Sequence, residues 1–297
     1  MKKKKIKASD IADFLGAKLF GDDLEIDKVC PIDRIGDNAL SFAKHFKEEY
    51  AAVMNANPHS LVVCPEEYMD KIEASYIVSD NPRLDFLRVI DQFFAPKEEI
   101  RIEESALIHP DATLGKNISI GAHVVIGPEV VIGNFTRIGN NVVLKGKVRI
   151  GKNCVIKSNS VIGEEGFGFE YSEFGIPQHF PHIGSVEIGD NVYIGSCSTV
   201  ERATIDKTWI ADNVKIDDLV QVGHNSTIER NTMVMAGSII CGGAFIGQRC
   251  WIAPNSTIKE KVRIGENALI GLGSVVINDV PLKSVWAGNP AKEIKKR

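Results

Sequence analysis

The sequence predicts a mainly β fold, in which a solenoid of short strands follows a small α/β domain. Aliphatic residues recur at every sixth position over most of the segment from Ile108 to Val276, whereas residues 1–97 lack this repeat. The composition, with 44% hydrophobic and 25% charged residues, is that of an ordinary globular protein. A chain of 297 residues exceeds most single compact domains, so two domains are expected.

The repeat has a period of six residues, which fits neither an amphipathic helix nor a plain alternating strand. It fits a short strand followed by a turn. The aliphatic residue points into the core, and the Gly or Asn after it is expected to adopt the backbone angles of a tight corner. Three units close one triangular coil, so residues about eighteen apart lie one above another, and stacked coils bury one aliphatic column. The inward positions fall in three runs: Ile108, Leu114, Ile120, Ile126, Ile132, Ile138, Leu144, Ile150, Ile156 and Ile162; Ile188, Ile194 and Val200; and Ile210, Ile216, Val222, Ile228, Val234, Ile240, Ile246, Ile252, Ile258, Ile264, Ile270 and Val276.

The repeat is interrupted twice. Between Ile162 and Ile188 the phase breaks, and the insert at 163–182 is rich in glycine and aromatic residues. Aromatic residues on a loop that leaves a regular scaffold suggest a binding surface or a subunit contact. A smaller slip lies between Val200 and Ile210. Both interruptions come just before the segment that contains His224.

The flanking segments complete the domain organisation. Residues 1–97 are expected to form the small α/β domain, because they carry two helical and two buried-strand patterns, at 9–15, 82–94, 60–64 and 76–79. Gly16 is expected to end the first helix. The β-helix domain is expected over 98–280, and 281–297 is expected to be a short C-terminal tail.

Charge and patterning exclude several functions. A net charge of −4 argues against a nucleic-acid partner, which would require a basic face. No run of roughly 18 apolar residues occurs, so no membrane span is expected, and no signal peptide is evident, which favours the cytoplasm. The six cysteines lack C-x-x-C spacing and are interpreted as small buried hydrophobic residues, with no bound metal.

One histidine stands out as a candidate catalytic residue. Only His224 lies in the regular solenoid with acidic residues and glycines around it. Gly242 is one coil above, where the absence of a side chain leaves a backbone N–H open to a ligand. Asp217 lies on the preceding side of the triangle, where its carboxylate could orient the imidazole. A base, an orienting acid and a backbone N–H are the groups that acyl transfer requires. The alternative is a surface histidine beside a turn at Asn225.

At 163–169 (GEEGFGF), 182–190 (HIGSVEIGD) and 215–225 (KIDDLVQVGHN), the sequence resembles the UDP-3-O-acylglucosamine N-acyltransferases of lipid A biosynthesis. The N-terminal domain is similar at 39–42 (ALSF) and 80–82 (DNP). The resemblance implies a left-handed parallel β-helix, a homotrimer with active sites between subunits, a uridine-nucleotide-binding first domain and an acyl-carrier-protein thioester as donor. No bound cofactor is expected, since the acyl carrier protein or coenzyme A thioester is a co-substrate.

The same resemblance assigns the site residues. It places the catalytic histidine on His224, the supporting aspartate on Asp217 and the oxyanion glycine on Gly242. The other expected residues are Phe42, His45, Tyr50, Asn81, Phe167, Phe169 and Asn225 for the nucleotide-sugar substrate, and Gly243, Lys261 and Arg263 for the donor.

Three other functions compete with an N-acyltransferase acting on a nucleotide-linked amino sugar. The segment 287–292 (AGNPAK) resembles the closing coil of coenzyme-A-dependent acetyltransferases, which favours an acetyl-coenzyme-A-dependent sugar N- or O-acetyltransferase. A zinc hydro-lyase would need three converging histidines, but His109 and His123 lie several coils from His224. A non-catalytic sugar-binding scaffold would have no need for the arrangement around His224.

Overall fold

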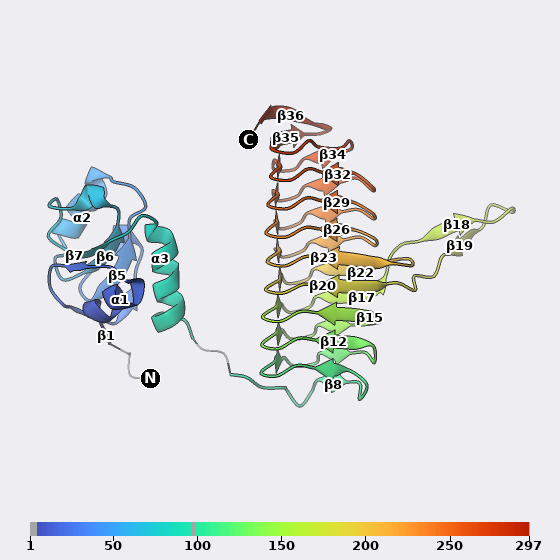
Figure 1. Ribbon diagram of the computed structural model, residues 1–297, viewed down its shortest axis with the longest axis horizontal. Helices are drawn as coiled ribbons and strands as arrows, with labels where there is room; N and C mark the ends of the chain where they lie inside the picture. Colours follow the sequence, from blue (N-terminus) through green and yellow to red (C-terminus); the bar gives the residue numbers. More distant parts are fainter. Residues whose placement is uncertain (1–4, 97–98, 297) are drawn as a thin grey trace. The chain divides into compact units, whose positions relative to one another are not determined.

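The computed structural model describes residues 5–96 and 99–296, and the chain divides into two compact units, Met1–Glu98 and Glu99–Arg297. Figure 1 shows an α/β fold in the first unit and a column of stacked coils in the second. Across the described ranges, no helix is long and apolar enough to cross a membrane.

The first unit is built on a five-stranded sheet. The strands run in the order β2 (Leu19–Phe20), β7 (Ser75–Val78), β6 (Leu61–Cys64), β5 (Ala39–Phe42) and β4 (Lys28–Val29). All neighbouring pairs are parallel except β2 with β7. Successive residues of β6 enter different apolar clusters, Leu61 and Val63 in one and Val62 and Cys64 in the other. A strand that is buried on both faces is typical of a covered parallel sheet.

Helices and short turns complete this unit. The remaining elements are β1 (Ile6–Lys7), α1 (Ala8–Leu15), β3 (Glu25–Ile26), η1 (Ile32–Arg34), α2 (Glu48–Asn55), η2 (Glu66–Tyr68), α3 (Pro82–Val89) and a π-helical turn η3 (Ile90–Phe94). Gly16 ends α1 in the left-handed conformation, with φ of 64°, as expected. The side chain of Asn81 accepts a hydrogen bond from the Leu84 N–H and caps α3. The predicted small α/β fold is confirmed.

The second unit is a parallel β-helix with three sheets, one on each side of the triangular coil. The first sheet contains β10 (Ser119–Ile120), β13 (Arg137–Ile138), β16 (Val155–Ile156), β21 (Tyr193–Ile194), β24 (Lys215–Ile216), β27 (Met233–Val234), β30 (Trp251–Ile252), β33 (Leu269–Ile270), β35 (Ser284–Gly288) and β36 (Ala291–Lys296). The second contains β8 (Leu107–Ile108), β11 (Val125–Ile126), β14 (Val143–Leu144), β17 (Val161–Glu165), β22 (Thr199–Arg202), β25 (Gln221–Val222), β28 (Ile239–Ile240), β31 (Thr257–Ile258) and β34 (Val275–Val276). The third contains β9 (Thr113–Leu114), β12 (Val130–Ile132), β15 (Lys147–Ile150), β20 (Ser185–Ile188), β23 (Lys207–Ile210), β26 (Thr227–Ile228), β29 (Phe245–Ile246) and β32 (Arg263–Ile264).

The strand register explains the period of six. Ile120 pairs with Ile138, eighteen residues on, and Ile138 pairs with Ile156. These inward residues are almost fully buried and belong to one continuous apolar cluster. Each coil therefore covers the aliphatic residues of its neighbours, as the repeat predicts.

The corners differ from the expectation for glycine. The left-handed conformation falls on the third residue after the inward one, which is usually asparagine, as at Asn141 (φ 58°) and Asn231 (φ 60°). Most glycines that directly follow an inward residue have another role. A Cβ on Gly133 would lie 2.6 Å from the carbonyl carbon of Gly151. Glycine is used there because the next coil approaches closely, so the expected turn role for it is wrong.

Both predicted interruptions are real features of the coil. Across the insert, Val155 pairs with Tyr193, and the insert itself forms an antiparallel hairpin of β18 (Phe169–Tyr171) and β19 (Pro177–His179). Figure 1 shows this hairpin projecting sideways from the column. At the second slip, Tyr193 pairs with Lys215, so this coil has four residues more than a regular one.

The C-terminal segment differs from the expected tail. The strand β35 pairs in parallel with β33, and β36 folds back antiparallel to β35. This hairpin covers the last coil, which would otherwise expose the end of the apolar column and a row of unpaired backbone groups.

Candidate active site

The candidate catalytic histidine occupies a corner between two sheets. His224 lies in the turn between β25 and β26 and is half-buried. Its ring packs edge-on against that of His182, with 5.0 Å between centroids and 82° between planes. The other histidine comes from the end of the insert, so the interruption in the repeat brings a second imidazole to this corner.

Asn225 determines which nitrogen of His224 carries the proton. The Asn225 side-chain oxygen accepts hydrogen bonds from the backbone N–H of Thr204 at 3.1 Å and from its hydroxyl at 3.0 Å. The same oxygen lies 2.8 Å from His224 Nδ1. Because this oxygen can only accept, Nδ1 must be the donor, and the neutral ring keeps its lone pair on Nε2. The second slip of the repeat supplies Thr204 and thereby fixes the tautomer.

A carboxylate also lies at this corner. Glu201, in β22, accepts a hydrogen bond from the His224 backbone N–H at 3.1 Å. Its other oxygen accepts from the Gln221 side-chain amide at 3.2 Å. A Cβ placed on Gly166 would lie 2.6 Å from Glu201 Oε2 and 2.9 Å from His224 Cδ2. The carboxylate therefore holds the loop that carries the imidazole and lies close to the ring edge.

Gly242 and Gly243 lie directly above His224, as the eighteen-residue spacing predicts. A Cβ on Gly242 would lie 2.7 Å from His224 Nε2, so any side chain there would displace the ring. The N–H of Gly243 donates to the His224 carbonyl at 2.8 Å, whereas the Gly242 N–H has no hydrogen-bond partner in the described part of the chain. An unpaired N–H beside Nε2 is suited to bind an oxyanion.

Asp217 is not near His224 within one chain. It follows β24 at a different corner, where its carboxylate accepts hydrogen bonds from the backbone N–H of Asp218 at 2.8 Å and of Ala236 at 3.2 Å. Seven residues are slightly more than one side of the triangle, so the two side chains are held at neighbouring corners. Among the described residues, the imidazole Nδ1 is bonded to Asn225 and the His224 backbone N–H to Glu201, and no hydrogen bond joins Asp217 to His224.

A hydrogen-bonded network anchors the insert beside the histidines. Glu165 accepts from Arg202 at 2.5 Å, from His179 Nε2 at 3.0 Å and from the backbone N–H of His182 at 3.3 Å. The His182 N–H, and after it the Arg202 guanidinium, lowers the pKa of Glu165. Atoms of Glu165, His179 and His182 lie within 4.8 Å of one another and could hold a metal ion. Glu165 is bonded to protein groups in this cluster, and the absence of a metal stays a prediction.

The aromatic residues of the insert lie beside this network. Phe167 is 87% exposed and Phe169 is 48% exposed, and their ring centroids are 4.8 Å apart. With Tyr171 and Pro177 they line a hollow of about 350 Å³. The structure therefore brings these two predicted substrate-binding residues together on the insert.

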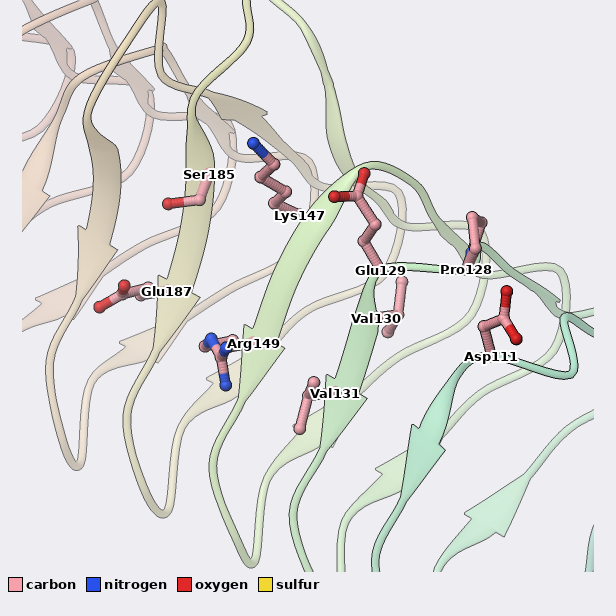
Figure 2. Close-up of a pocket in the computed structure, with 9 residues that line it drawn as sticks. All are labelled: Asp111, Pro128, Glu129, Val130, Val131, Lys147, Arg149, Ser185 and Glu187. Atoms are coloured by element: carbon pink, nitrogen blue, oxygen red, sulfur yellow. The ribbon is translucent and has the colours of Figure 1, made fainter.

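A groove on the outer face of the third sheet leads from the N-terminal coils towards His182. Figure 2 shows its lower part, a hollow of about 490 Å³ whose lining includes Lys147 and Arg149. A second hollow, of about 260 Å³, shares Glu129 and Lys147 with the first and extends to His182 and Arg202. Within the described ranges neither Lys147 nor Arg149 forms an ion pair, so both cations are open to an anionic ligand.

The predicted nucleotide-binding residues all lie in the first unit. Phe42, at the end of β5, packs against Phe86 with 4.8 Å between ring centroids, and Asn81 follows β7 at the same edge of the sheet. His45 is exposed three residues after β5, and Tyr50 lies in α2 beneath the Lys47 ammonium group. Ligands of parallel α/β sheets bind at this edge, beyond the carboxyl ends of the strands.

The predicted donor-binding residues lie above the histidine corner. Lys261 occupies the left-handed corner position of the next coil, and its N–H donates to the Gly242 carbonyl at 3.1 Å. A Cβ on Gly243 would lie 3.3 Å from Lys261 Cγ. The guanidinium of Arg263 lies on the outer face of the third sheet, 4.1 Å from the centroid of the Phe245 ring. Gly243 and Lys261 are thus stacked, and Arg263 lies on the adjoining side of the coil.

A solenoid of stacked six-residue repeats is the fold of the hexapeptide-repeat transferases. Residues 243–278 match the family model described as bacterial transferase hexapeptide (six repeats), and residues 102–166 match that of the GMPPB C-terminal domain. Among solved structures, the fold is similar to the UDP-N-acetylglucosamine acyltransferase of Francisella novicida, with a TM-score of 0.61 and 26% identity over 66% of this chain and 71% of that one. LpxA from Acinetobacter baumannii gives a TM-score of 0.60 and 26% identity over 65% and 73%.

Sequence relatives narrow the class to one family. The chain is 34% identical to the UDP-3-O-acylglucosamine N-acyltransferase of Campylobacter lari over 82% of this chain and 80% of that protein. It is 39% identical to the enzyme of that name from Oleidesulfovibrio alaskensis, over 71% of this chain and 66% of the relative, which is just under two thirds of its length. The corresponding protein of Nitratidesulfovibrio vulgaris is 31% identical, over 81% and 74%. The chain belongs to the UDP-3-O-acylglucosamine N-acyltransferase family, and it is an acyltransferase.

Proposed function

We propose that the protein transfers an acyl group from a thioester donor to the amine of a nucleotide-linked amino sugar, for lipid A or a related surface glycan. The names of the relatives support this substrate class. The single observation that carries the chemistry is the hydrogen bond from His224 Nδ1 to Asn225, which leaves Nε2 free to accept a proton beside the Gly242 N–H.

In the proposed reaction, His224 Nε2 removes a proton from the acceptor nitrogen as that nitrogen attacks the thioester carbonyl. A carbon–nitrogen bond forms, and the Gly242 N–H stabilises the negative charge on the carbonyl oxygen. When the carbon–sulfur bond breaks, the proton passes from His224 to the leaving thiolate. The Glu201 carboxylate stabilises the imidazolium formed between the two steps.

The other predicted residues are assigned to the two substrates. We assign the nucleotide to Phe42, His45, Tyr50 and Asn81, and the sugar to the surroundings of Phe167, Phe169 and Asn225. Gly243, Lys261 and Arg263 are assigned to an acyl carrier protein or coenzyme A thioester, whose phosphate groups would be attracted by the two cations.

We further propose a cytoplasmic homotrimer with active sites between subunits. Asp217 cannot act on His224 of its own chain, because its carboxylate is held at another corner. We therefore propose that Asp217 supports His224 of a neighbouring copy. One subunit would supply His224 and the next Asp217.

Replacement of the base tests this function. His224→Ala should lower kcat/KM for acyl transfer to a UDP-linked amino sugar by roughly 10²–10⁴-fold, as expected for loss of a general base. His109→Ala is the matched control, because His109 is exposed at an early coil and lies 3.7 Å from a carboxylate, Asp111. Unchanged transfer by the His224 variant, measured by mass spectrometry of the product, would refute the proposed mechanism.

A second candidate is an acetyl-coenzyme-A-dependent sugar N- or O-acetyltransferase. It is favoured by segment 287–292, which lies in the β35–β36 hairpin over the last coil. Turnover with acetyl-coenzyme A, and none with long-chain acyl carrier protein, would establish this donor in place of the first.

A further inference from the structure

His182 has an unusual environment for a histidine outside the predicted site. The residue is 1% exposed, and Nε2 has no hydrogen-bond partner among the described residues. Nδ1 lies 2.9 Å from the Phe180 carbonyl oxygen. A buried polar atom without a partner costs free energy, so its position requires an explanation.

The hydrogen bond to Phe180 fixes the tautomer of His182. A carbonyl oxygen can only accept, so Nδ1 carries the proton and the lone pair is on Nε2. A Cβ on Gly166 would lie 3.2 Å from His182 Nε2 and 2.9 Å from His224 Cδ2. Nε2 of His182 and the ring edge of His224 therefore border the same small space.

We propose that His182 is a positioning residue for the catalytic base, which holds the ring of His224 edge-on and stabilises its protonated form during transfer. This inference rests on the proposed role of His224. The Nε2 end of a neutral imidazole is electronegative, and a buried site screens its effect on a nearby cation weakly. Because Nε2 itself is inaccessible, His182 acts on the substrate only through His224.

The charged groups around His182 are engaged by other partners. Glu165 and His179 face it from the insert, and Glu201 and Arg202 face it from β22. Glu165 is paired with Arg202, and Glu201 is engaged by the backbone N–H of His224 and by Gln221. No carboxylate of the described residues accepts a hydrogen bond from Nε2.

Two amide substitutions separate the two ring nitrogens. In His182→Asn, the amide can replace Nδ1 as donor to Phe180, but nothing replaces Nε2. In His182→Gln, the amide oxygen can reach the position of Nε2. His182→Phe keeps a ring of similar size with neither nitrogen, and controls for packing. The pH dependence of kcat/KM and the NMR titration of the His224 imidazole should be measured in all three variants.

The inference predicts a graded result. His182→Gln should keep the acid limb of the wild type, whereas His182→Asn and His182→Phe should move it to lower pH by about 0.5 unit or more. The latter two should also lower kcat roughly tenfold or more, with a smaller effect on KM. The NMR titration should shift in the same direction, and it remains measurable if a variant is inactive.

The outcomes distinguish this inference from the proposed function. If the His224 titration is the same in all variants as in the wild type, or shifts equally in the Gln and Asn variants, the role of His182 is refuted and that of His224 stands. If His224→Ala remains fully active, the proposed function itself fails, whatever the titrations show.

Discussion

At the residue scale, the most informative side chain is Asn225, which the sequence suggested as a substrate contact and the structure places on His224 Nδ1. Its φ of 62° is tolerated by glycine, so Asn225→Gly removes the amide without backbone strain. Without this acceptor, the His224 ring can rotate and can carry its proton on either nitrogen. This should lower kcat roughly ten- to a hundredfold. Steady-state kinetics measure this effect.

Asn231→Gly is the control for that variant, because Asn231 occupies the same corner position of the following repeat, with φ of 60°. It should leave kcat unchanged and alter the melting temperature by a similar amount. Equal activity of the two variants would contradict an orienting role for Asn225.

Glu165 gives a pH-dependent prediction. The His182 N–H and Arg202 hold its pKa below the ordinary value of 4.5, so its contacts stabilise the folded state above that value and are lost as the pH falls through the lowered pKa. At neutral pH, hydrogen exchange of the insert should be faster in Glu165→Gln than in the wild type. The difference should vanish at a pH below the lowered pKa. Glu173→Gln, at an exposed hairpin carboxylate, should behave as the wild type at both pH values.

The sequence predicted that Gly242 lies above His224, but not which other residues contact His224. The pair could be found because a period of eighteen residues stacks them directly. Glu201, Thr204 and His182 lie in or beside the two interruptions, where the period no longer gives spatial neighbours. Their contacts depend on how the extra residues are accommodated, which no local pattern encodes.

At the element scale, the glycines that follow inward residues differ in how closely the next coil approaches. A Cβ on Gly133 would lie 2.6 Å from backbone of the next coil, whereas a Cβ on Gly127 would meet nothing closer than 3.4 Å. Gly133→Ala should therefore lower the free energy of unfolding by about 1–3 kcal/mol. Gly127→Ala should change the free energy of unfolding by less than about 1 kcal/mol. The change should be stabilising where the substitution acts by reducing the conformational freedom of the unfolded chain. Chemical denaturation measures both, and equal effects would contradict the steric explanation.

Strand positions were predictable because each inward aliphatic residue marks one, from Ile108 to Val276. The roles of glycine and asparagine at the corners were not. Both glycine and asparagine tolerate the left-handed backbone conformation. The sequence does not reveal which position of the turn adopts this conformation. The strands β35 and β36 were not predicted, because segment 281–297 has no six-residue repeat to mark them, although 287–292 resembles a closing coil.

At the scale of the whole molecule, both fold classes followed from patterning, since a period of six and its absence before residue 98 separate the two units. The family followed from motifs around the two interruptions. What a single chain cannot supply is a contact between Asp217 and His224, because intrachain hydrogen bonds hold the aspartate at another corner.

The proposed shared site makes a prediction about mixed oligomers. If the active site combines His224 of one subunit with Asp217 of the next, His224→Ala and Asp217→Asn chains should each be nearly inactive alone. Unfolded together in equal amounts and refolded, they should regain activity, because about a quarter of the interfaces in a random cyclic trimer pair two intact residues. Light scattering should give a mass near three times the 32.5 kDa chain. Recovery of activity requires both variants in one oligomer. Folded oligomers of the two variants that are mixed without refolding are the control and should stay inactive. A trimer without recovery would remove Asp217 from the site, and Asn225 and Glu201 would remain as the residues that orient the base.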